Sequence, residues 1–493
     1  MRGLRPLAWR PLLVVFAGQA ALLLATANRY GYHRDELYFR VAGRHLQWGY
    51  PDQPPLTPLL GRVSEALFGE TPRGLRVVSV LAMVACALLA ALIARELGGG
   101  AAAQTVAAAA FAASGYALAV GHLLSTSTFD VLAWAALSWL FVRLLRTGDH
   151  RLWLLLGLTS GVGLLNKHLV LLFWASIAAG ILASRRLDLL RSRYVPAGAA
   201  LGLALWAPNL VWQARHDWPQ LTLARQIADE DPTGNRIALL PLQAVLLGPV
   251  VLLLAVVGLR LLARDERLAR FRPLVWAYPF LLVVTLLLGA KFYYPAGMFA
   301  LLCGAGGLAA ERWLARGGAR RVALLAAGIA VWFVPSLPLV LPILPSSQLA
   351  DSPVPDVNED AIETVGWPGF VRQVAAVRAR VPDAVVFAGS YGEAGAIYRY
   401  GPALGIDRVY SGHNGFADWQ KPPDAARDAV VVGFFDEHSH AYLRGLCTSV
   451  TLAGRIDNGV GLDNEEQGGP IYVCRGMRRS WSEEWPRLRH LDA

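Results

Sequence analysis

The chain has 493 residues, of which 55% are hydrophobic and only 17% are charged, and its formal net charge is +10. Soluble domains carry about a quarter charged residues, so this composition excludes a wholly soluble protein and predicts that most of the chain lies in a lipid bilayer. A positive net charge can indicate binding to nucleic acid. Here the arginines lie in short segments between apolar runs, so we expect no nucleic-acid partner.

Eleven apolar segments predict an α-helical polytopic membrane domain that covers residues 1–345. The first segment, 11–27, follows a basic start and is just long enough to span a bilayer. Residues 25–27 resemble a signal-peptidase site, but further spans follow and we expect an uncleaved anchor. The other predicted spans are 75–94, 101–121, 127–145, 152–166, 169–184, 195–213, 239–260, 273–290, 294–311 and 321–343.

The distribution of arginine predicts the orientation, because Lys and Arg concentrate in short cytoplasmic loops. Counted from a cytoplasmic N-terminus, the even-numbered loops fall on the same side as Arg2, Arg5 and Arg10. Their arginines lie at 95, 143–151, 185–193, 260–272 and 312–321. We therefore expect a multi-pass protein of the plasma (inner) membrane, with a cytoplasmic N-terminus and with the first long loop, 28–74, and the C-terminal tail outside.

The tail predicts a small extracytoplasmic α/β domain, residues 359–493, after a proline-containing linker, 346–358. A helix is expected over 359–380 and another over 392–400. Strands are expected over 384–389, 429–434 and 470–474, and such alternation is typical of a compact α/β layer. Cys447 and Cys474 would lie outside, where disulfides persist, and we predict that they pair.

Two adjacent acids, Asp35 and Glu36, stand among aromatic residues in the first long loop. An isolated acidic pair in a loop is usually a solvated surface feature. A carboxylate in a partly desolvated cleft can instead act as a general base, and paired acids can hold a divalent cation.

Asp130 is a second candidate acid, at the outer end of the fourth predicted span. A Ser or Thr followed by an acid is also ordinary helix-start chemistry, which is the alternative interpretation. A charged residue that faces the inside of a membrane bundle is nevertheless a candidate functional residue.

Both lysines of the membrane region, Lys167 and Lys291, lie at outer span ends, against the expected charge bias. Snorkelling could explain either one alone. Two such lysines in a chain with only three predict a site for an anion, with phosphate the first candidate. Arg29, Arg34 and His122 could join them. The glycine-rich stretch 389–395 in the tail is explained by a strand-to-helix turn without a nucleotide.

Together these residues resemble the GT-C glycosyltransferases, in particular the family-39 and aminoarabinose-transferase-like group that includes protein O-mannosyltransferases. The resemblance covers nearly the whole membrane region. It rests on Asp35-Glu-Leu-Tyr38, Asp52-Gln-Pro-Pro-Leu-Thr-Pro58, Ser127-Thr-Phe-Asp130 and Gly163-Leu-Leu-Asn-Lys167. The tail, with Gly389-Ser-Tyr-Gly-Glu-Ala-Gly395 and Asp463-Asn-Glu-Glu-Gln467, is similar to a bacterial branch.

The resemblance implies transfer of a sugar from a polyprenyl-phosphate carrier to a glycan, lipid or protein acceptor at the outer face of the membrane. Asp35 would activate the acceptor, with Glu36 as its neighbour and Asp130 as the second outer-loop acid. Tyr38, Asp52 and Gln53 would form the substrate loop.

One departure from the family pattern concerns the carrier phosphate. Relatives often have lysine where this chain has Gln53, and that lysine contacts the phosphate. Lys167, Lys291 or a first-loop arginine would then substitute for it. We expect inverting transfer. The residues leave a divalent metal open, and Asp35, Glu36 and Asp130 would hold it if one is used.

Two other functions fit the same sequence. A transporter or flippase of a lipid-linked saccharide would also need a charged outer cavity. Such a protein often shows internal repeats and helices broken at mid-membrane. The sequence shows no such repeat, and its charges lie at one face instead of in the middle of the spans. A non-catalytic assembly subunit with a polymer-binding tail would keep sugar transfer intact after loss of every carboxylate named above.

Overall fold

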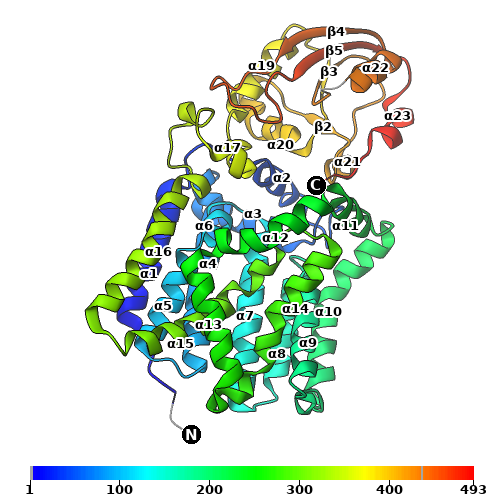
Figure 1. Ribbon diagram of the computed structural model, residues 1–493. Helices are drawn as coiled ribbons and strands as arrows, with labels where there is room; N and C mark the ends of the chain where they lie inside the picture. Colours follow the sequence, from blue (N-terminus) through cyan, green and yellow to red (C-terminus); the bar gives the residue numbers. More distant parts are fainter. Residues whose placement is uncertain (1–3, 435–436, 493) are drawn as a thin grey trace.

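The computed structural model describes residues 4–434 and 437–492, so Arg2 lies outside the described residues. A long helical bundle carries a smaller α/β tail domain at one end, and the N-terminus lies at the other end (Figure 1). The bundle helices are α1 (Trp9–Thr26), α4 (Pro72–Glu96), α5 (Ala101–Ala112), α6 (Gly115–His122), α7 (Thr126–Thr147), α8 (Leu152–Leu164), α9 (Val170–Ala183), α10 (Tyr194–Arg215), α12 (Pro232–Leu247), α13 (Pro249–Arg264), α14 (Pro273–Leu288), α15 (Phe299–Leu314) and α16 (Gly318–Val340).

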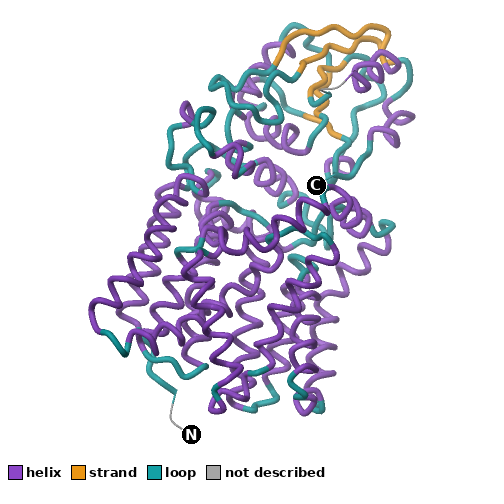
Figure 2. The backbone as a smooth tube through the Cα atoms, in the orientation of Figure 1, coloured by secondary structure: helices purple, strands orange, loops and turns teal. Residues whose placement is uncertain are grey.

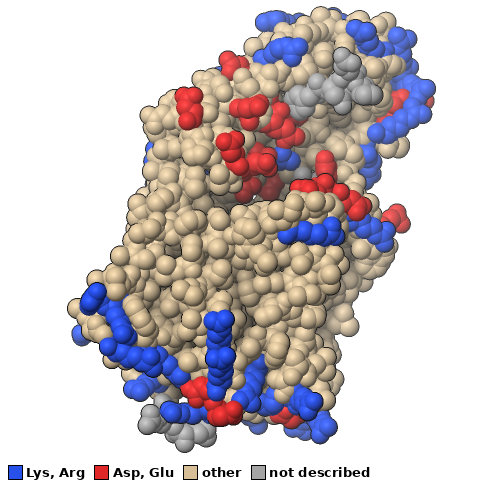
Figure 3. All heavy atoms as spheres, viewed as in Figure 1, with Lys and Arg blue, Asp and Glu red and all other residues tan. Residues whose placement is uncertain are grey.

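The apolar helices make this a multi-pass membrane protein. Among the described residues, five helices are long and apolar enough to cross a membrane, or seven if each of two bent pairs is one span. Three shorter apolar helices, α8, α9 and α14, stand beside them. In the space-filling view an uncharged band separates two charged ends (Figure 3). The count of eleven spans stays a prediction.

Two predicted spans are not straight helices. The segment predicted as one span over 239–260 is the pair α12 and α13, bent by 99°. The bend lies at Gly248, whose φ of +93° favours glycine, and at Pro249, which starts the next helix. The pair α5 and α6 bends by 58°, and the hydroxyl of Ser114 caps the second helix.

Lys and Arg side chains gather at the end of the bundle opposite the tail domain (Figure 3). There Glu96 of α4 pairs with Arg146 and, at 3.5 Å, with Arg143. The arginine-rich loops thus share one end of the molecule, as their spacing predicts.

The first long loop, predicted as loop over 28–74, is largely helical. It contains α2 (Arg34–Ala42) and α3 (Leu56–Phe68), and α4 already begins at Pro72. A capping box begins α2: the His33 ring accepts a hydrogen bond from the backbone of Asp35, and the Glu36 carboxylate accepts one from the backbone of His33. Histidine is not among the preferred N-cap residues, so the sequence pattern missed this start. A further helix, α11 (Pro219–Glu230), occupies another predicted loop.

Strands occur only in the tail domain among the described residues (Figure 2). The mixed sheet has the order β2-β1-β3-β5-β4, with β1 parallel to β2 and β3, and β5 antiparallel to β3 and β4. The strands are β1 (Val385–Ala388), β2 (Val409–Ser411), β3 (Ala429–Val432), β4 (Cys447–Arg455) and β5 (Pro470–Met477). The three predicted strands are confirmed, and β2 and β4 were missed because β2 is short and β4 is largely exposed.

The tail helices are short. They are α17 (Val354–Val357), α18 (Glu359–Ile362), α19 (Trp367–Arg378), α20 (Tyr391–Tyr400), α21 (Phe416–Trp419), α22 (Glu437–Leu446) and α23 (Trp481–Leu488). The described residues also form 3₁₀ helices in the bundle and the tail: η1 (Leu187–Leu190), η2 (Glu266–Phe271), η3 (Tyr294–Met298), η4 (Ser346–Gln348) and η5 (Pro402–Leu404). The helix predicted over 359–380 is broken at Gly366, which has a φ of +100°. The predicted linker is folded, since Leu349 and Val354 pack with Ile362, Val365 and Leu462.

The tail domain is joined to the bundle through one continuous apolar core. Leu37 of α2 and Trp367 of α19 belong to the same buried cluster as the membrane helices. Within the sheet a disulfide joins Cys447 to Cys474, with Cα atoms 5.7 Å apart, so the predicted pairing is confirmed.

Candidate active site

Asp35 lies at the start of α2, on the side of the bundle that faces the tail. Its carboxylate accepts a hydrogen bond at Oδ1 from the hydroxyl of Tyr391, at 2.8 Å. Tyr391 is the first residue of α20 in the tail domain. Within the described part of the chain no hydrogen bond reaches the second oxygen, Oδ2, and the residue is half-buried. Asp35 therefore has one fixed oxygen and one that is available to a substrate.

Glu36 is fully buried and forms a two-point ion pair with Arg76 of α4, which is also fully buried. Arg76 Nε donates to Oε1 at 2.8 Å and Nη2 donates to Oε2 at 2.7 Å. The backbone N–H groups of His33 and Leu124 each donate a further bond to this carboxylate at 2.9 Å. With four donors on its two oxygens, Glu36 holds the first loop against the bundle. Its predicted catalytic role stays a prediction that this geometry does not favour.

Asp130 and Lys167 lie in the same region as Asp35, since the charges of both carboxylates act on Lys167. Asp130 is 5% exposed and accepts a hydrogen bond from the indole of Trp134 at 3.1 Å. Lys167 Nζ donates to the hydroxyl of Ser127 at 3.2 Å. Burial lowers the pKa of Lys167, and the nearby carboxylates of Asp130 and Asp35 act in the opposite direction.

Two tyrosines that the sequence did not single out complete this corner. The Lys167 ammonium lies 5.8 Å from the ring centre of Tyr293 and 5.7 Å from that of Tyr294, within the range of cation–π attraction. The run of three aromatic residues after Lys291 was the signal that could have found them.

The predicted substrate loop also lies next to Asp35. The Tyr38 hydroxyl donates to Asp52 Oδ1 at 2.5 Å, and its ring centre is 5.2 Å from that of Tyr391. Burial raises the pKa of Asp52 to about 7, opposed by the Tyr38 hydrogen bond and assisted by the charge of Asp35. Gln53 is 4% exposed, and neither of its side-chain polar atoms has a hydrogen-bond partner among the described residues.

Two of the predicted phosphate ligands are engaged by acidic residues. Lys291 donates to Glu230 of α11 at 2.6 Å. Arg34 is held by two tail carboxylates, Glu465 and, at 3.1 Å, Glu363. Their charges are therefore already compensated by acidic neighbours.

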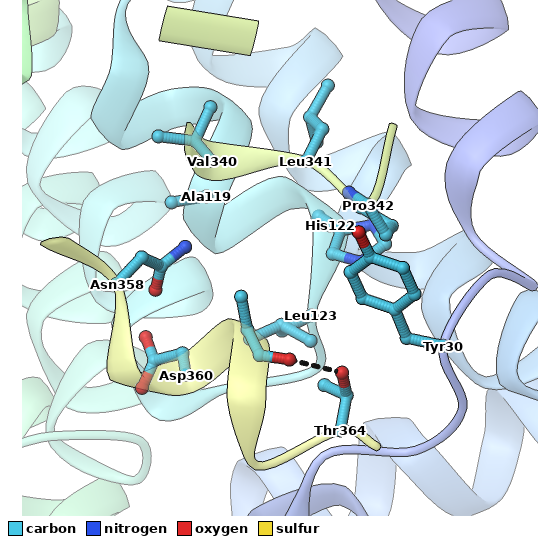
Figure 4. A pocket seen from close by; sticks show the side chains of 11 residues that line it. Tyr30, Ala119, His122, Leu123, Val340, Leu341, Pro342, Asn358, Asp360 and Thr364 are labelled. Carbon is cyan, nitrogen blue, oxygen red and sulfur yellow. Dashed lines mark hydrogen bonds between the residues drawn. The ribbon is translucent and has the colours of Figure 1, made fainter. Parts of the chain in front are cut away.

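The other two predicted phosphate ligands lie apart from Lys167. Arg29 is exposed beside Tyr30. His122 is buried, 3.4 Å from the guanidinium of Arg76. It lines a pocket of about 20 Å³ with Asp360 and Tyr30 (Figure 4). This pocket has room for a water molecule and none for a sugar.

A larger cleft of about 890 Å³ opens between the tail domain and the bundle. Arg34 and Glu363 form part of its wall, and acids from α11, α17, α18 and the segment 463–465 line the rest. The space-filling view shows this hollow with Asp and Glu side chains around it (Figure 3). The volume matches that of a site for a small organic ligand.

The residues do not fit the predicted metal set. Four N–H donors already occupy the oxygens of Glu36. Over residues 4–434 and 437–492, no three His, Cys, Asp or Glu side chains come together in a way that could hold a metal ion. The chemistry below is therefore derived from this chain's own side chains.

Comparison with known proteins identifies the class to which this architecture is similar. Residues 52–212 match the sequence model of the family described as dolichyl-phosphate-mannose-protein mannosyltransferase. No curated protein matches the chain in sequence.

Solved structures share the fold over nearly the whole chain. ArnT from Cupriavidus metallidurans bound to undecaprenyl phosphate is 14% identical, with a TM-score of 0.62 over 94% of this chain and 97% of that one. The same protein in the apo state is 15% identical, with a TM-score of 0.58 over the same shares of the two chains. The fold of this chain is therefore that of ArnT, and residues 52–212 agree with the predicted family resemblance.

Proposed function

We propose that the protein is a membrane glycosyltransferase that moves a sugar from a polyprenyl-phosphate carrier to a glycan, lipid or protein acceptor. The observation that carries the proposal is the meeting of Asp35, Asp130 and Lys167 at the tail-facing end of the bundle. The same fold in ArnT is known with undecaprenyl phosphate bound, which supports a lipid-linked donor.

Asp35 would act as the general base. Its free oxygen, Oδ2, would take the proton of an acceptor hydroxyl while that oxygen forms a bond to the anomeric carbon of the sugar. The bond from the anomeric carbon to the phosphate oxygen breaks as the new bond forms. Direct displacement of this kind inverts the anomeric configuration.

Lys167 would stabilise the polyprenyl monophosphate as it leaves, because an ammonium in a partly buried site interacts strongly with developing negative charge. Burial lowers the pKa of Lys167, and the charge of Asp130 opposes this effect. Tyr293, Tyr294 and the wall of the tail domain would exclude water that could otherwise hydrolyse the donor.

The arrangement of charges supports a site outside the cytoplasm. The arginine-rich loops lie at the end of the bundle opposite the tail (Figure 3), and such loops are typically cytoplasmic. On this basis the N-terminus is cytoplasmic, and the tail and the site face the outside of the plasma membrane.

The test uses purified protein with a panel of polyprenyl-phosphate sugars and measures release of the carrier phosphate. Asp35→Asn should lower the transfer rate by roughly 10²–10⁴-fold, the usual effect of losing a general base. The matched control is Asp383→Asn, which changes an exposed tail acid in the same way. Full activity of Asp35→Asn would refute the assignment, and no release from any donor would favour the transporter.

A further inference from the structure

The geometry points to Tyr391 of the tail domain as the residue that positions the catalytic carboxylate of Asp35, so that the active site is complete only when the tail is docked. This inference rests on the proposed function of Asp35. The two residues are 356 positions apart in the chain, and their side chains meet at 2.8 Å.

The direction of this hydrogen bond is fixed by a second contact. Arg34 Nε donates to the Tyr391 hydroxyl oxygen at 3.1 Å, and an arginine can only donate. Burial, together with the charge of Asp35, raises the pKa of Tyr391 well above its ordinary value despite the opposing charge of Arg34. The phenol therefore keeps its proton and donates a hydrogen bond to Oδ1 of Asp35.

The consequence is an oriented base. With Oδ1 held by Tyr391, the carboxylate cannot rotate freely, and Oδ2 is the oxygen left for the acceptor. The Tyr391 ring is itself held, because its centre lies 5.2 Å from that of Tyr38 and 4.8 Å from that of His413.

Two glycines of α20 allow the close packing on α2 that places Tyr391 beside Asp35. A Cβ on Gly395 would lie 2.8 Å from the Leu37 side chain and 3.0 Å from its carbonyl oxygen, and a Cβ on Gly392 would lie 2.8 Å from Arg34. Helix α20 can therefore pack directly on α2 because these two residues have no side chain. The glycine-rich stretch of the tail thus contains the predicted strand-to-helix turn, between β1 and α20, and in addition allows close helix packing.

The tail also contacts α2 through ion pairs. Glu363, after α18, and Glu465, in the loop before β5, both accept hydrogen bonds from Arg34. The Arg34 side chain is 15% exposed, so these contacts are partly shielded from solvent. Three separate segments of the tail therefore fix the residue next to Asp35.

The test compares Tyr391→Phe with Tyr398→Phe. Both changes remove one hydroxyl from α20, and Tyr398 lies under the guanidinium of Arg44 instead of reaching Asp35. Tyr391→Phe should lower kcat roughly 10- to 100-fold, the loss expected for a hydrogen bond to a charged group, and leave the KM for the donor unchanged. Tyr398→Phe should keep wild-type kcat.

Combination with Asp35→Asn separates positioning from a general effect on structure. If Tyr391 acts through Asp35, adding Tyr391→Phe to Asp35→Asn should cause no further fall in kcat. A wild-type kcat for Tyr391→Phe, or a further fall of the same size in the double variant, would overturn the inference.

The wild-type protein, Tyr391→Phe, Asp35→Asn and their double variant are also compared by thermal unfolding, which needs no substrate. Non-additive changes in Tm for the two substitutions would establish the contact even if no sugar donor is turned over. Additive changes in Tm would overturn the inference, and absence of transfer by the wild-type protein would overturn only the proposed function.

Discussion

The buried ion pair between Arg76 and Glu36 gives the sharpest prediction on stability. The perturbation is Arg76→Met, which keeps a long apolar side chain of similar length and removes the charge. Glu36 would lose both side-chain donors and keep only the two backbone N–H groups. The carbonyl oxygens of Ala27 and Gly31 would each lose a donor at 2.7 Å.

Removal of one partner of a buried pair typically costs about 3–5 kcal/mol, because an uncompensated charge remains. The free energy of unfolding of a whole protein is only about 5–15 kcal/mol, so we expect a large fall in Tm. Both side chains are fully buried, so solvent screening does not reduce this value. The double variant Arg76→Met, Glu36→Gln should recover part of the loss, since no unpaired charge is left.

The assay is thermal unfolding of the purified protein in detergent, with Arg73→Met as the matched control. Arg73 lies on the same helix, exposed, so its replacement should change the free energy of unfolding by no more than about 0.5 kcal/mol. Equal Tm values for Arg76→Met and Arg73→Met would refute the reasoning. In Glu36→Gln we expect any fall in the transfer rate to be accompanied by a fall in Tm. A lower transfer rate at an unchanged Tm would instead indicate a catalytic role for Glu36.

Burial and the charge of Glu393 raise the pKa of Glu466 from 4.5 to about 8. Between pH 4.5 and pH 8 the folded protein therefore binds more protons than the unfolded one. The free energy of unfolding falls as the pH rises through that range. Glu466→Gln should therefore raise Tm at pH 8 and have little effect at pH 4, and equal shifts at both would contradict this. Replacing Cys447 and Cys474 by serine should destabilise the protein by about 3 kcal/mol through the lost loop constraint, measured as a lower Tm that reducing agent does not lower further. Lys167→Met should weaken binding of polyprenyl phosphate at least about 10-fold, measured by equilibrium binding, and unchanged affinity would exclude it as the phosphate ligand.

The presence of a bundle of apolar helices could be predicted from the sequence because membrane helices follow local rules of length and apolarity. The same local rules fail where backbone geometry intervenes. Nothing in the hydropathy of 239–260 indicates the 99° bend at Gly248. Helices α2 and α3 were missed because a run of aromatic, proline and charged residues is typical of a loop. In the structure α3 packs on α4, and α2 packs on α20 and α3.

The sequence could predict at which face of the membrane the residues of the candidate site lie, but not which other residues they contact. Topology places Asp35, Asp130 and Lys167 at the same end of the bundle, and the structure brings them together. Sequence reasoning could not find their partners, because the partners lie far away in the chain. Arg76 is 40 residues from Glu36, and a charge in the first turn of a membrane helix gives no sign of which loop acid it will meet.

These partners change the meaning of the acidic pair in the first loop. Adjacent residues on a helix point about 100° apart, so Asp35 and Glu36 cannot share one environment. Glu36 faces α4, where Arg76 neutralises it and fixes the loop to the bundle. Asp35 faces the tail, where Tyr391 leaves one of its oxygens free. Glu36 therefore holds the helix in place, and in the proposed function this leaves Asp35 positioned to act as the base.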